Sequence, residues 1–333
     1  MRTIQHPVVI GSGSWGTALA HLLAHSGHTV RILAIEEDVV ASINASHENV
    51  RYLSGARLHD RVSATLDPEV LREADLAVLA VPCQVLRAAL RDYRDLLSPD
   101  IVAVNAAKGI ELESLHTPCD IVRTEIPSLA KRYAALSGPS FAREVMENKP
   151  TAVVLGCADE ALGAYLRTVF ATAWFRSYSS TDVLGVELGG AVKNVMAIAA
   201  GLADGLGYGH NARAALITRG LVELGRLGVA LGARAETLGG LSGLGDLVLT
   251  CTGDLSRNRT TGLRLGAGES LVHIVATLGS VAEGVKTTAS LHTLAEQHGV
   301  DMPIVDAVHG ILYENREPVE AVRKLFEREL KVE

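Results

Sequence analysis

The stretch HPVVIGSGSWGTALAHLLAHSGHTVRILAIEED, residues 6–38, decides the fold of this chain. A short apolar run predicts a strand over Val8–Ile10, and Thr17–His25 has the spacing of a helix that Gly27 ends. The aliphatic and β-branched run Thr29–Ile35 predicts a second strand. The stretch therefore predicts one strand–helix–strand unit.

The turn between the first strand and the helix carries the pattern GxGxxG. Gly11 permits the tight turn, Gly13 lets the backbone approach a pyrophosphate, and Gly16 lets helix and strand pack closely. The helix N-terminus then offers N–H groups to the phosphates. The pattern alone is weak evidence, but here it lies between a strand and a helix. An acid, Glu36, follows about 20 residues on, so the unit is predicted to bind a dinucleotide.

Five further apolar runs predict the rest of an α/β sheet. They are Ala74–Pro82, Asp100–Gly109, Tyr133–Pro139, Thr151–Cys157 and Trp174–Ser180. Runs that are apolar on both faces are typical of a parallel sheet covered by helices on both sides. Ligands of such sheets bind at the carboxyl ends of the strands. Lys108 lies at one such end, and the segment SGPS, residues 137–140, lies at another.

From about Asp182 the strand signals nearly vanish, and segments rich in Ala, Leu and Gly with helical spacing follow. They are Val183–Leu206, Ala212–Leu227, Ala235–Thr250, Leu271–Thr277, Val285–His298 and Pro303–Tyr313. The sequence therefore predicts two domains. Residues 1–181 form a Rossmann-like dinucleotide-binding domain, and residues 182–333 form an all-helical domain for substrate binding and catalysis.

Composition excludes several classes of function. The net charge of -7 over 333 residues argues against nucleic-acid or anionic-membrane binding. The four cysteines form no CxxC, which indicates neither a zinc site nor a disulfide framework, so we expect no metal and a reducing, cytoplasmic location. The N-terminus lacks the apolar core of a signal peptide, and charges interrupt the apolar segment 188–207. We therefore expect no membrane insertion.

That apolar segment, LGGAVKNVMAIAAGLADGLG, contains Lys193. A lysine on an apolar helix commonly lays its stem along the core and lifts its ammonium to water. The alternative is that Lys193 faces a cleft and exchanges protons there. Asp246, in the apolar run GLGDLVLTC, raises the same choice between a cleft and a paired core group. The cluster SRNR, residues 256–259, is either a solvated basic turn or a phosphate site.

Eight motifs together resemble one enzyme family nearly end to end. They are, in order, GSGSWGTALA, AAKGIE, LSGPSFA, LGGAVKNV, NARAALITRG, LGDLVLTCT, SRNR and AEGVKT. The family is the bacterial-type NAD(P)-dependent glycerol-3-phosphate dehydrogenases. The resemblance implies reversible reduction of dihydroxyacetone phosphate to sn-glycerol 3-phosphate by NAD(P)H. It also implies that the product supplies glycerophospholipid synthesis.

The resemblance also implies site residues, with Lys193 as the general acid and base. Substrate contacts are implied for Lys108, Gly138, Ser140, Asp246, Ser256, Arg257 and Asn258. Cofactor contacts beside the glycine turn are implied for Ser14, Trp15, Lys108, Ala142, Arg257, Val281 and Glu283. These roles agree with the chemistry: a lysine can protonate the substrate oxygen, and a guanidinium fork suits a phosphate dianion.

One position departs from the family pattern. Many relatives carry Arg or His where a 2′-phosphate would lie, after the second strand, but this chain has Ile35 there, followed by acids. Glu36 can accept a hydrogen bond from a ribose 2′-OH and would repel a 2′-phosphate. We therefore expect NAD(H) to be favoured over NADP(H).

Two other functions fit parts of this pattern. 3-Hydroxyacid dehydrogenases also combine a Rossmann domain, a helical domain and a lysine, but their lysine lies in the pattern KxxxN. Here Asn194 follows Lys193 directly, and the fourth residue after Lys193 is Ala197. A non-catalytic nucleotide-binding sensor is the second alternative, although the proposed proton donor and phosphate ligands are all present. The apolar helical domain also suggests a homodimer.

Overall fold

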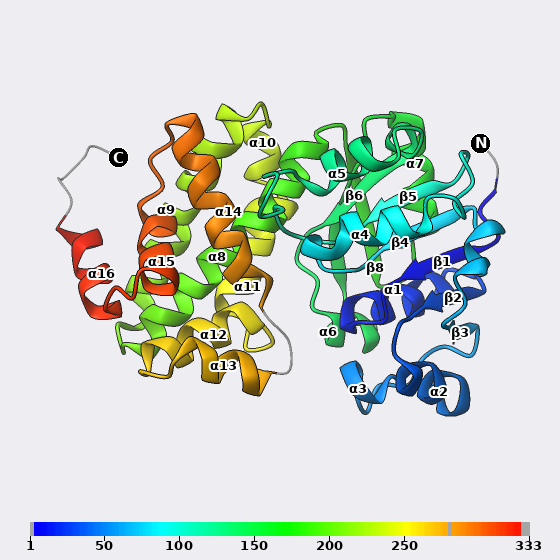
Figure 1. Cartoon of the computed structure of the whole chain (residues 1–333), viewed down its shortest axis with the longest axis horizontal. Helices are drawn as coiled ribbons and strands as arrows, with labels where there is room; N and C mark the ends of the chain where they lie inside the picture. Colours follow the sequence, from blue (N-terminus) through cyan, green and yellow to red (C-terminus); the bar gives the residue numbers. More distant parts are fainter. Residues whose placement is uncertain (1–2, 279–281, 328–333) are drawn as a thin grey trace. The chain divides into compact units, whose positions relative to one another are not determined.

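The computed structural model describes residues 3–278 and 282–327 (Figure 1). The chain forms two compact units. The first contains the chain up to Lys108 together with His116–Glu187, and the second contains Gly109–Leu115 and the chain from Leu188 onward. The short excursion Gly109–Leu115 was not predicted from the sequence.

The first unit is built on an eight-stranded sheet with the strand order β3-β2-β1-β4-β5-β6-β7-β8. The strands are β1 (Pro7–Ile10), β2 (Val30–Leu33), β3 (Val62–Thr65), β4 (Leu76–Leu79), β5 (Val102–Asn105), β6 (Tyr133–Ser137), β7 (Thr151–Gly156) and β8 (Phe175–Ser180). Val9 of β1 pairs with Ile32 on one side and with Val78 on the other. Every residue of β1, β4 and β5 is buried, so helices and loops cover both faces of the sheet at its centre.

Two features of this sheet differ from the prediction. β3 was not predicted, because VSAT is short and only partly apolar. β7 runs antiparallel to β6, whereas a parallel sheet was predicted. The connection explains this difference, because its only helix, α6 (Ala142–Met146), has five residues and rises about 7 Å. That helix is too short to return the chain along a strand of about 17 Å, as a parallel pair requires.

The other helices of the first unit follow the strands that they connect. They are α1 (Ser14–His25), α2 (Glu37–Ser46), α3 (Val50–Leu53), α4 (Cys83–Tyr93), α5 (Pro118–Glu125) and α7 (Glu160–Val169), with 3₁₀ turns at Pro68–Arg72 and Leu129–Arg132. α1 packs against α6, and α4 packs against α5. The buried face of α1 includes Leu19, Leu22 and Leu23, which join the main apolar core of this unit.

The regular elements in the described part of the second unit are helices. α8 (Val183–Gly205) starts in the first unit, and the others are α9 (Gly209–Ala230), α10 (Ala235–Leu238), α11 (Asp246–Thr252), α12 (Arg257–Gly266), α13 (Leu271–Leu278), α14 (Glu283–His298), α15 (Pro303–Tyr313) and α16 (Pro318–Phe326). The segment Ala235–Thr250, predicted as one helix, is divided by a π turn at Leu241–Gly245. α12 and α16 were not predicted as helices.

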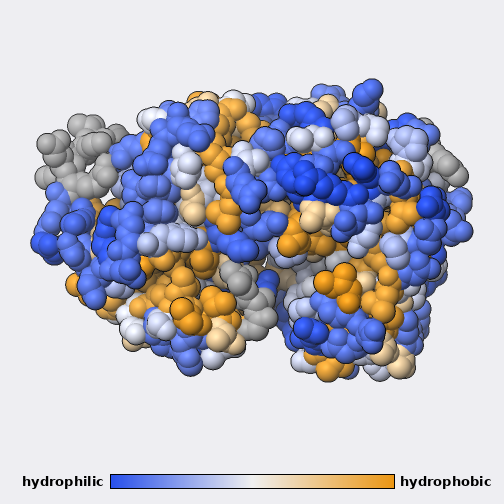
Figure 2. All heavy atoms as spheres, viewed as in Figure 1, coloured by the Kyte–Doolittle hydropathy of each residue, from blue (hydrophilic) through white to orange (hydrophobic). Residues whose placement is uncertain are grey.

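α8 is long and apolar enough to cross a membrane, but 83% of its most apolar window is buried inside the protein. It is therefore the core helix of this unit. The surface over α12 and α13 carries a group of apolar side chains (Figure 2), among which Leu263 is 38% exposed and Val272 is 82% exposed.

A buried carboxylate caps one helix of the second unit from a distance. Glu223 of α9 accepts hydrogen bonds from the backbone N–H of Ile304 (2.7 Å) and Val305 (3.3 Å) at the start of α15. Burial raises the pKa of Glu223 to about 8, although these two bonds favour the ionised form. The carboxyl group is therefore more easily kept neutral in the folded protein than in the unfolded chain.

This shift predicts a pH-dependent stability. Because the pKa is raised on folding, the contribution of Glu223 is fully present below about pH 4.5 and is lost as the pH rises towards about 8. Glu223→Gln removes the titrating group and keeps one of its two acceptor oxygens. Its unfolding free energy, measured by urea denaturation, should gain about 1–3 kcal/mol relative to the wild type between pH 5 and pH 8. Glu327→Gln, at an exposed position, is the control; a constant difference across this pH range would contradict the prediction.

Candidate functional site

The glycine turn has the geometry that its three glycines predicted. Gly11 has a φ of +112°, and a Cβ on it would lie 2.8 Å from the carbonyl oxygen of Ala80. A Cβ on Gly16 would lie 2.1 Å from the carbonyl oxygen of Gly11, so helix and strand pack backbone to backbone. Around Gly13, by contrast, no described atom lies within 4 Å of such a Cβ. The turn is closed on its inner side and open at Gly13, where a pyrophosphate needs room.

The first turn of α1 adds donors at this opening. No side chain from the described part of the chain caps α1, so its leading N–H groups face outward as an anion site requires. Ser14 donates from its hydroxyl to the carbonyl oxygen of Tyr52 (2.9 Å). The indole Nε1 of Trp15 is buried and has no hydrogen-bond partner among the described residues. The N–H groups at the start of α1 therefore fit a dinucleotide phosphate, whereas the Ser14 hydroxyl is bonded within the protein and the Trp15 nitrogen is buried.

Glu36 lies just beyond β2, as predicted, and is held by two hydroxyl groups. Ser12 Oγ donates to one carboxylate oxygen (2.7 Å), and the Tyr52 hydroxyl donates to the other (2.8 Å). Burial opposes ionisation of Glu36, but these bonds and backbone N–H groups lower its pKa below the ordinary value. Ile35, the residue before it, is 82% exposed. The site therefore presents a fixed negative charge beside an apolar side chain.

The carboxyl ends of β5 and β6 bring two predicted segments together. Lys108 Nζ donates to the carbonyl oxygen of Gly138 (3.1 Å), and Ser140 Oγ donates to the same oxygen (2.9 Å). Gly138 has a φ of +140°, and a Cβ there would lie 2.9 Å from Val153 Cα. Only glycine fits this position without strain. Ala142 follows as the first residue of α6.

In the second unit, Lys193 is buried in the middle of α8 and is paired. Its Nζ donates to Asp246 Oδ1 (2.7 Å) and to Thr250 Oγ1 (3.0 Å). Lys193 is 9% exposed and Asp246 is 1% exposed. The ammonium is therefore not lifted to water along the helix surface. Thr250 was not predicted as a site residue, although it lies four residues after Asp246 and hence on the same helix face.

A π turn aims Asp246 at this lysine. The turn Leu241–Gly245 ends where α11 begins with Asp246. The π turn packs closely against α8 at Gly189, one helical turn before Lys193. A Cβ on Gly189 would lie 2.4 Å from the carbonyl oxygen of Ser242 in the turn. π turns recur at functional sites because they re-aim side chains. The unusual backbone here serves the Lys193–Asp246 pair.

The residues of SRNR form the first turn of α12. Ser256 is the N-cap, and its hydroxyl accepts from the backbone N–H of Arg259 (3.2 Å). Arg257 is the first helical residue and is exposed. Asn258 Nδ2 donates to Asn194 Oδ1 (2.9 Å), and Asn258 Oδ1 accepts from the backbone N–H of Gly284 (3.0 Å). The first turn of α12 is thus tied to the residue next to Lys193.

Two predicted site residues remain, Val281 and Glu283. Glu283 is the first residue of α14, beside Gly284. Val281 lies outside the described residues. Among the described residues, no group of three or more His, Cys, Asp or Glu side chains could hold a metal ion.

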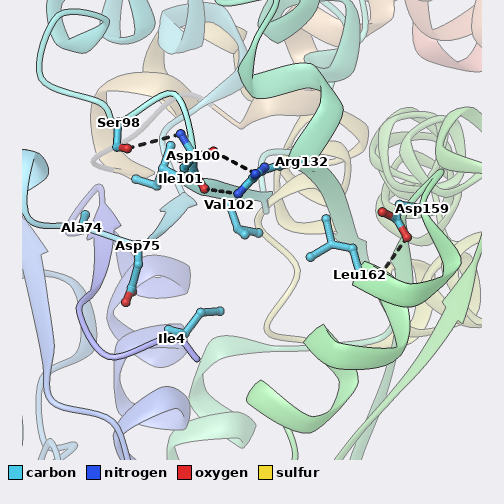
Figure 3. A pocket seen from close by; sticks show the side chains of 10 residues that line it. All are labelled: Ile4, Ala74, Asp75, Ser98, Asp100, Ile101, Val102, Arg132, Asp159 and Leu162. Carbon is cyan, nitrogen blue, oxygen red and sulfur yellow. Dashed lines mark hydrogen bonds and ion pairs between the residues drawn. The ribbon is translucent and has the colours of Figure 1, made fainter. Parts of the chain in front are cut away.

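A cavity of about 490 Å³ lies at the opposite, amino edge of the sheet (Figure 3). Its polar groups already make structural bonds. Asp75 accepts from the backbone N–H of Gln5 and His6, Arg132 pairs with Asp100, and Asp159 caps α7. None of the predicted site residues lines this cavity. It is therefore not the candidate active site.

Comparison with known proteins decides the family. The family model of the NAD-dependent glycerol-3-phosphate dehydrogenase N-terminus matches residues 7–163, and that of the C-terminus matches residues 182–323. The chain belongs to the NAD-dependent glycerol-3-phosphate dehydrogenase family. The resemblance inferred from the motifs is confirmed, as is the fold class.

Individual relatives agree. A glycerol-3-phosphate dehydrogenase [NAD(P)+] of Nitratidesulfovibrio vulgaris (strain DP4) is 60% identical, covering 98% of this chain and 99% of that protein. The crystal structure of a glycerol-3-phosphate dehydrogenase from Coxiella burnetii has a TM-score of 0.93 at 40% identity, covering 98% of this chain and 99% of that one. A ketopantoate reductase of Ralstonia eutropha, at 17% identity and a TM-score of 0.62, shares the fold alone. This family member is therefore an oxidoreductase.

The contacts of Lys193 predict the effect of removing one of them. Thr250→Val keeps the shape of the side chain but removes one of the two anchors of the ammonium. We expect kcat to fall about tenfold, because the amine spends less time correctly oriented, with the KM for the nicotinamide cofactor unchanged.

Thr252→Val is a matched control. Thr252 lies on the same helix, also donates to the carbonyl four residues earlier (2.8 Å), and is exposed. Its substitution should leave kcat within about twofold. Equal losses in both variants would show that the helix, and not the anchor, matters.

Proposed function

We propose that this chain interconverts dihydroxyacetone phosphate and sn-glycerol 3-phosphate, with Lys193 exchanging a proton with the oxygen on C2. The observation that carries the proposal is the buried ammonium held by Asp246 and Thr250. We assign cofactor binding to residues 1–181, and substrate binding and catalysis to residues 182–333. The bound cofactor supplies or accepts the hydride at C2.

The hydrogen bonds of Lys193 suit a proton donor. An ammonium has three hydrogens, and in the described part of the chain two of them are committed to Asp246 and Thr250. The third is available to the ketone oxygen of the substrate. In the reduction, the C2–O double bond opens, the carbon gains hydride, and the oxygen gains this proton. In the reverse direction, the neutral amine takes the proton back.

Asp246 holds and orients the ammonium of Lys193. The carboxylate is 1% exposed, and the contact between the two charges offsets the cost of burying them. With the ammonium fixed in this way, its remaining N–H can be presented to the ketone oxygen.

The phosphate of the substrate is assigned to the first turn of α12. Arg257 offers a guanidinium fork, and Asn258 donates one of its two amide hydrogens to Asn194 within the described part of the chain. Ser256 lies at the same helix start, whose dipole favours an anion. Lys108, Gly138 and Ser140 are assigned to substrate as well, with Lys108 and Arg257 also touching the cofactor.

For the cofactor, the glycine turn, Ser14, Trp15 and Ala142 are assigned to the dinucleotide, together with Val281 and Glu283. Preference for NAD(H) rests on Glu36, because a fixed carboxylate repels a 2′-phosphate and Ile35 offers no cation to offset it. No metal is assigned. We also propose a cytoplasmic homodimer that supplies glycerophospholipid synthesis. The exposed apolar side chains of the second unit, Val272 among them, support the dimer.

Removing the proton donor tests the proposed mechanism. Lys193→Ala should lower turnover of dihydroxyacetone phosphate and NADH about a thousandfold, while NADH binding, followed by fluorescence titration, changes less than about twofold. Lys286→Ala, an exposed lysine of α14, should keep wild-type turnover. Activity that survives in Lys193→Ala would remove the assigned role.

The cofactor preference is tested by measuring kcat/KM with NADH and with NADPH. We expect NADH to be preferred about tenfold or more, and Glu36→Gln to reduce that ratio by removing the negative charge. Glu37→Gln changes the charge by the same amount at the neighbouring exposed position and should leave the ratio unchanged. A preference of the wild type for NADPH would contradict the proposal.

A further inference from the structure

α8 and α12 are in direct backbone contact through glycines. Gly201 and Gly205 lie four residues apart on α8, and Gly262 and Gly266 lie four apart on α12. A Cβ on Gly201 would lie 2.0 Å from the carbonyl oxygen of Arg259. Each of the other three would also bring its Cβ within 2.6 Å of a backbone oxygen of the facing helix. α12 therefore lies directly on the helix that carries Lys193.

A buried ion-pair cluster fastens the start of α12 to the same helix. Asp204 of α8 is 6% exposed at its side chain. One of its oxygens accepts from Arg259 Nε (3.0 Å) and Nη2 (2.8 Å), and the other accepts from Arg213 Nε (2.9 Å) and Nη2 (2.6 Å). Arg213 belongs to α9, so one carboxylate joins three helices.

All three nitrogens of the Arg259 guanidinium group donate hydrogen bonds within the protein. Besides the two bonds to Asp204, its Nη1 donates to Asp254 Oδ1 (2.8 Å). Its side chain is 13% exposed, whereas Arg257, two residues earlier, is exposed. The two arginines of SRNR therefore have different surroundings. Arg257 is the arginine assigned above to the phosphate, and Arg259 is bonded to Asp204 of α8.

The backbone of Arg259 also closes the cap of its helix. Its N–H donates to Ser256 Oγ (3.2 Å), which fixes the turn that contains Arg257 and Asn258. Asn258 in turn bonds Asn194, the neighbour of Lys193 (2.9 Å). A displacement of Arg259 would therefore move the first turn of α12 relative to Lys193.

We propose that Arg259 is a positioning residue for the substrate phosphate. By bonding Asp204 it holds the first turn of α12 in the arrangement that binds the phosphate, so that Arg257 and Asn258 are in place before the substrate arrives. The proposal rests on the phosphate assignment made above. Arg259 itself does not touch the substrate.

The test compares two arginines that share one carboxylate. Arg259→Lys keeps the charge but loses the fork, and Arg213→Lys makes the same change on the other oxygen of Asp204, from a helix without phosphate ligands. For Arg259→Lys, we expect the KM for dihydroxyacetone phosphate to rise about tenfold or more. The kcat should change less than about threefold, and the KM for NADH should stay constant. Arg213→Lys should lower the melting temperature to a similar extent while leaving all three constants near wild type.

Further variants separate the possible outcomes. Asp204→Asn keeps the shape of the grip without its charge, and should raise the same KM if Arg259→Lys does not fold. A rise in KM with Arg257→Lys but not with Arg259→Lys or Asp204→Asn overturns the positioning role alone. The positioning role alone is also overturned if Arg213→Lys raises the KM for dihydroxyacetone phosphate as much as Arg259→Lys does. An unchanged KM in Arg257→Lys overturns the phosphate assignment and the positioning role together.

Discussion

The ion pair between Lys193 and Asp246 is the constraint on which the second unit depends. Two opposite charges that are 9% and 1% exposed are stable only if each stays in contact with the other and with further polar partners. Thr250 meets that need by accepting from the lysine and donating to the backbone carbonyl of Asp246 (2.6 Å). The π turn before Asp246 and the glycine one turn before Lys193 bring the two helices close enough.

In both units, backbone segments come into close contact at glycine residues. Gly16 brings α1 against the first strand, Gly189 brings the π turn against α8, and Gly262 brings α12 against α8. In each case a Cβ would lie within 2.4 Å of a backbone oxygen. Aromatic residues make up only 4% of the chain, so the packing relies on small and aliphatic side chains. The candidate site residues are thus carried by helices and turns whose backbones are in direct contact.

The local pattern was enough to predict the strand–helix–strand unit, because GxGxxG has a geometric meaning at each glycine. Lys108 and Gly138 could be predicted to meet, since parallel strands end at one edge. β3 was missed because VSAT is only partly apolar, and the reversal at β7 depends on the length of α6. Tyr52 lies 16 residues along the chain from its partner Glu36, and Asp204 lies 55 residues from its partner Arg259. No local pattern in the sequence connects such pairs.

The two charged clusters of the second unit, one at Asp246 and one at Asp204, have different proposed roles. In the proposed mechanism, Asp246 holds an ammonium that loses a proton and regains it in every cycle. Asp204 holds two guanidinium groups, which stay protonated at any relevant pH, so its contacts persist throughout. Lysine suits the first place because it can lose its proton, and arginine suits the second because it cannot. In this proposal, one buried carboxylate serves a reactive pair between α11 and α8, and another serves a permanent pair between α8 and α12.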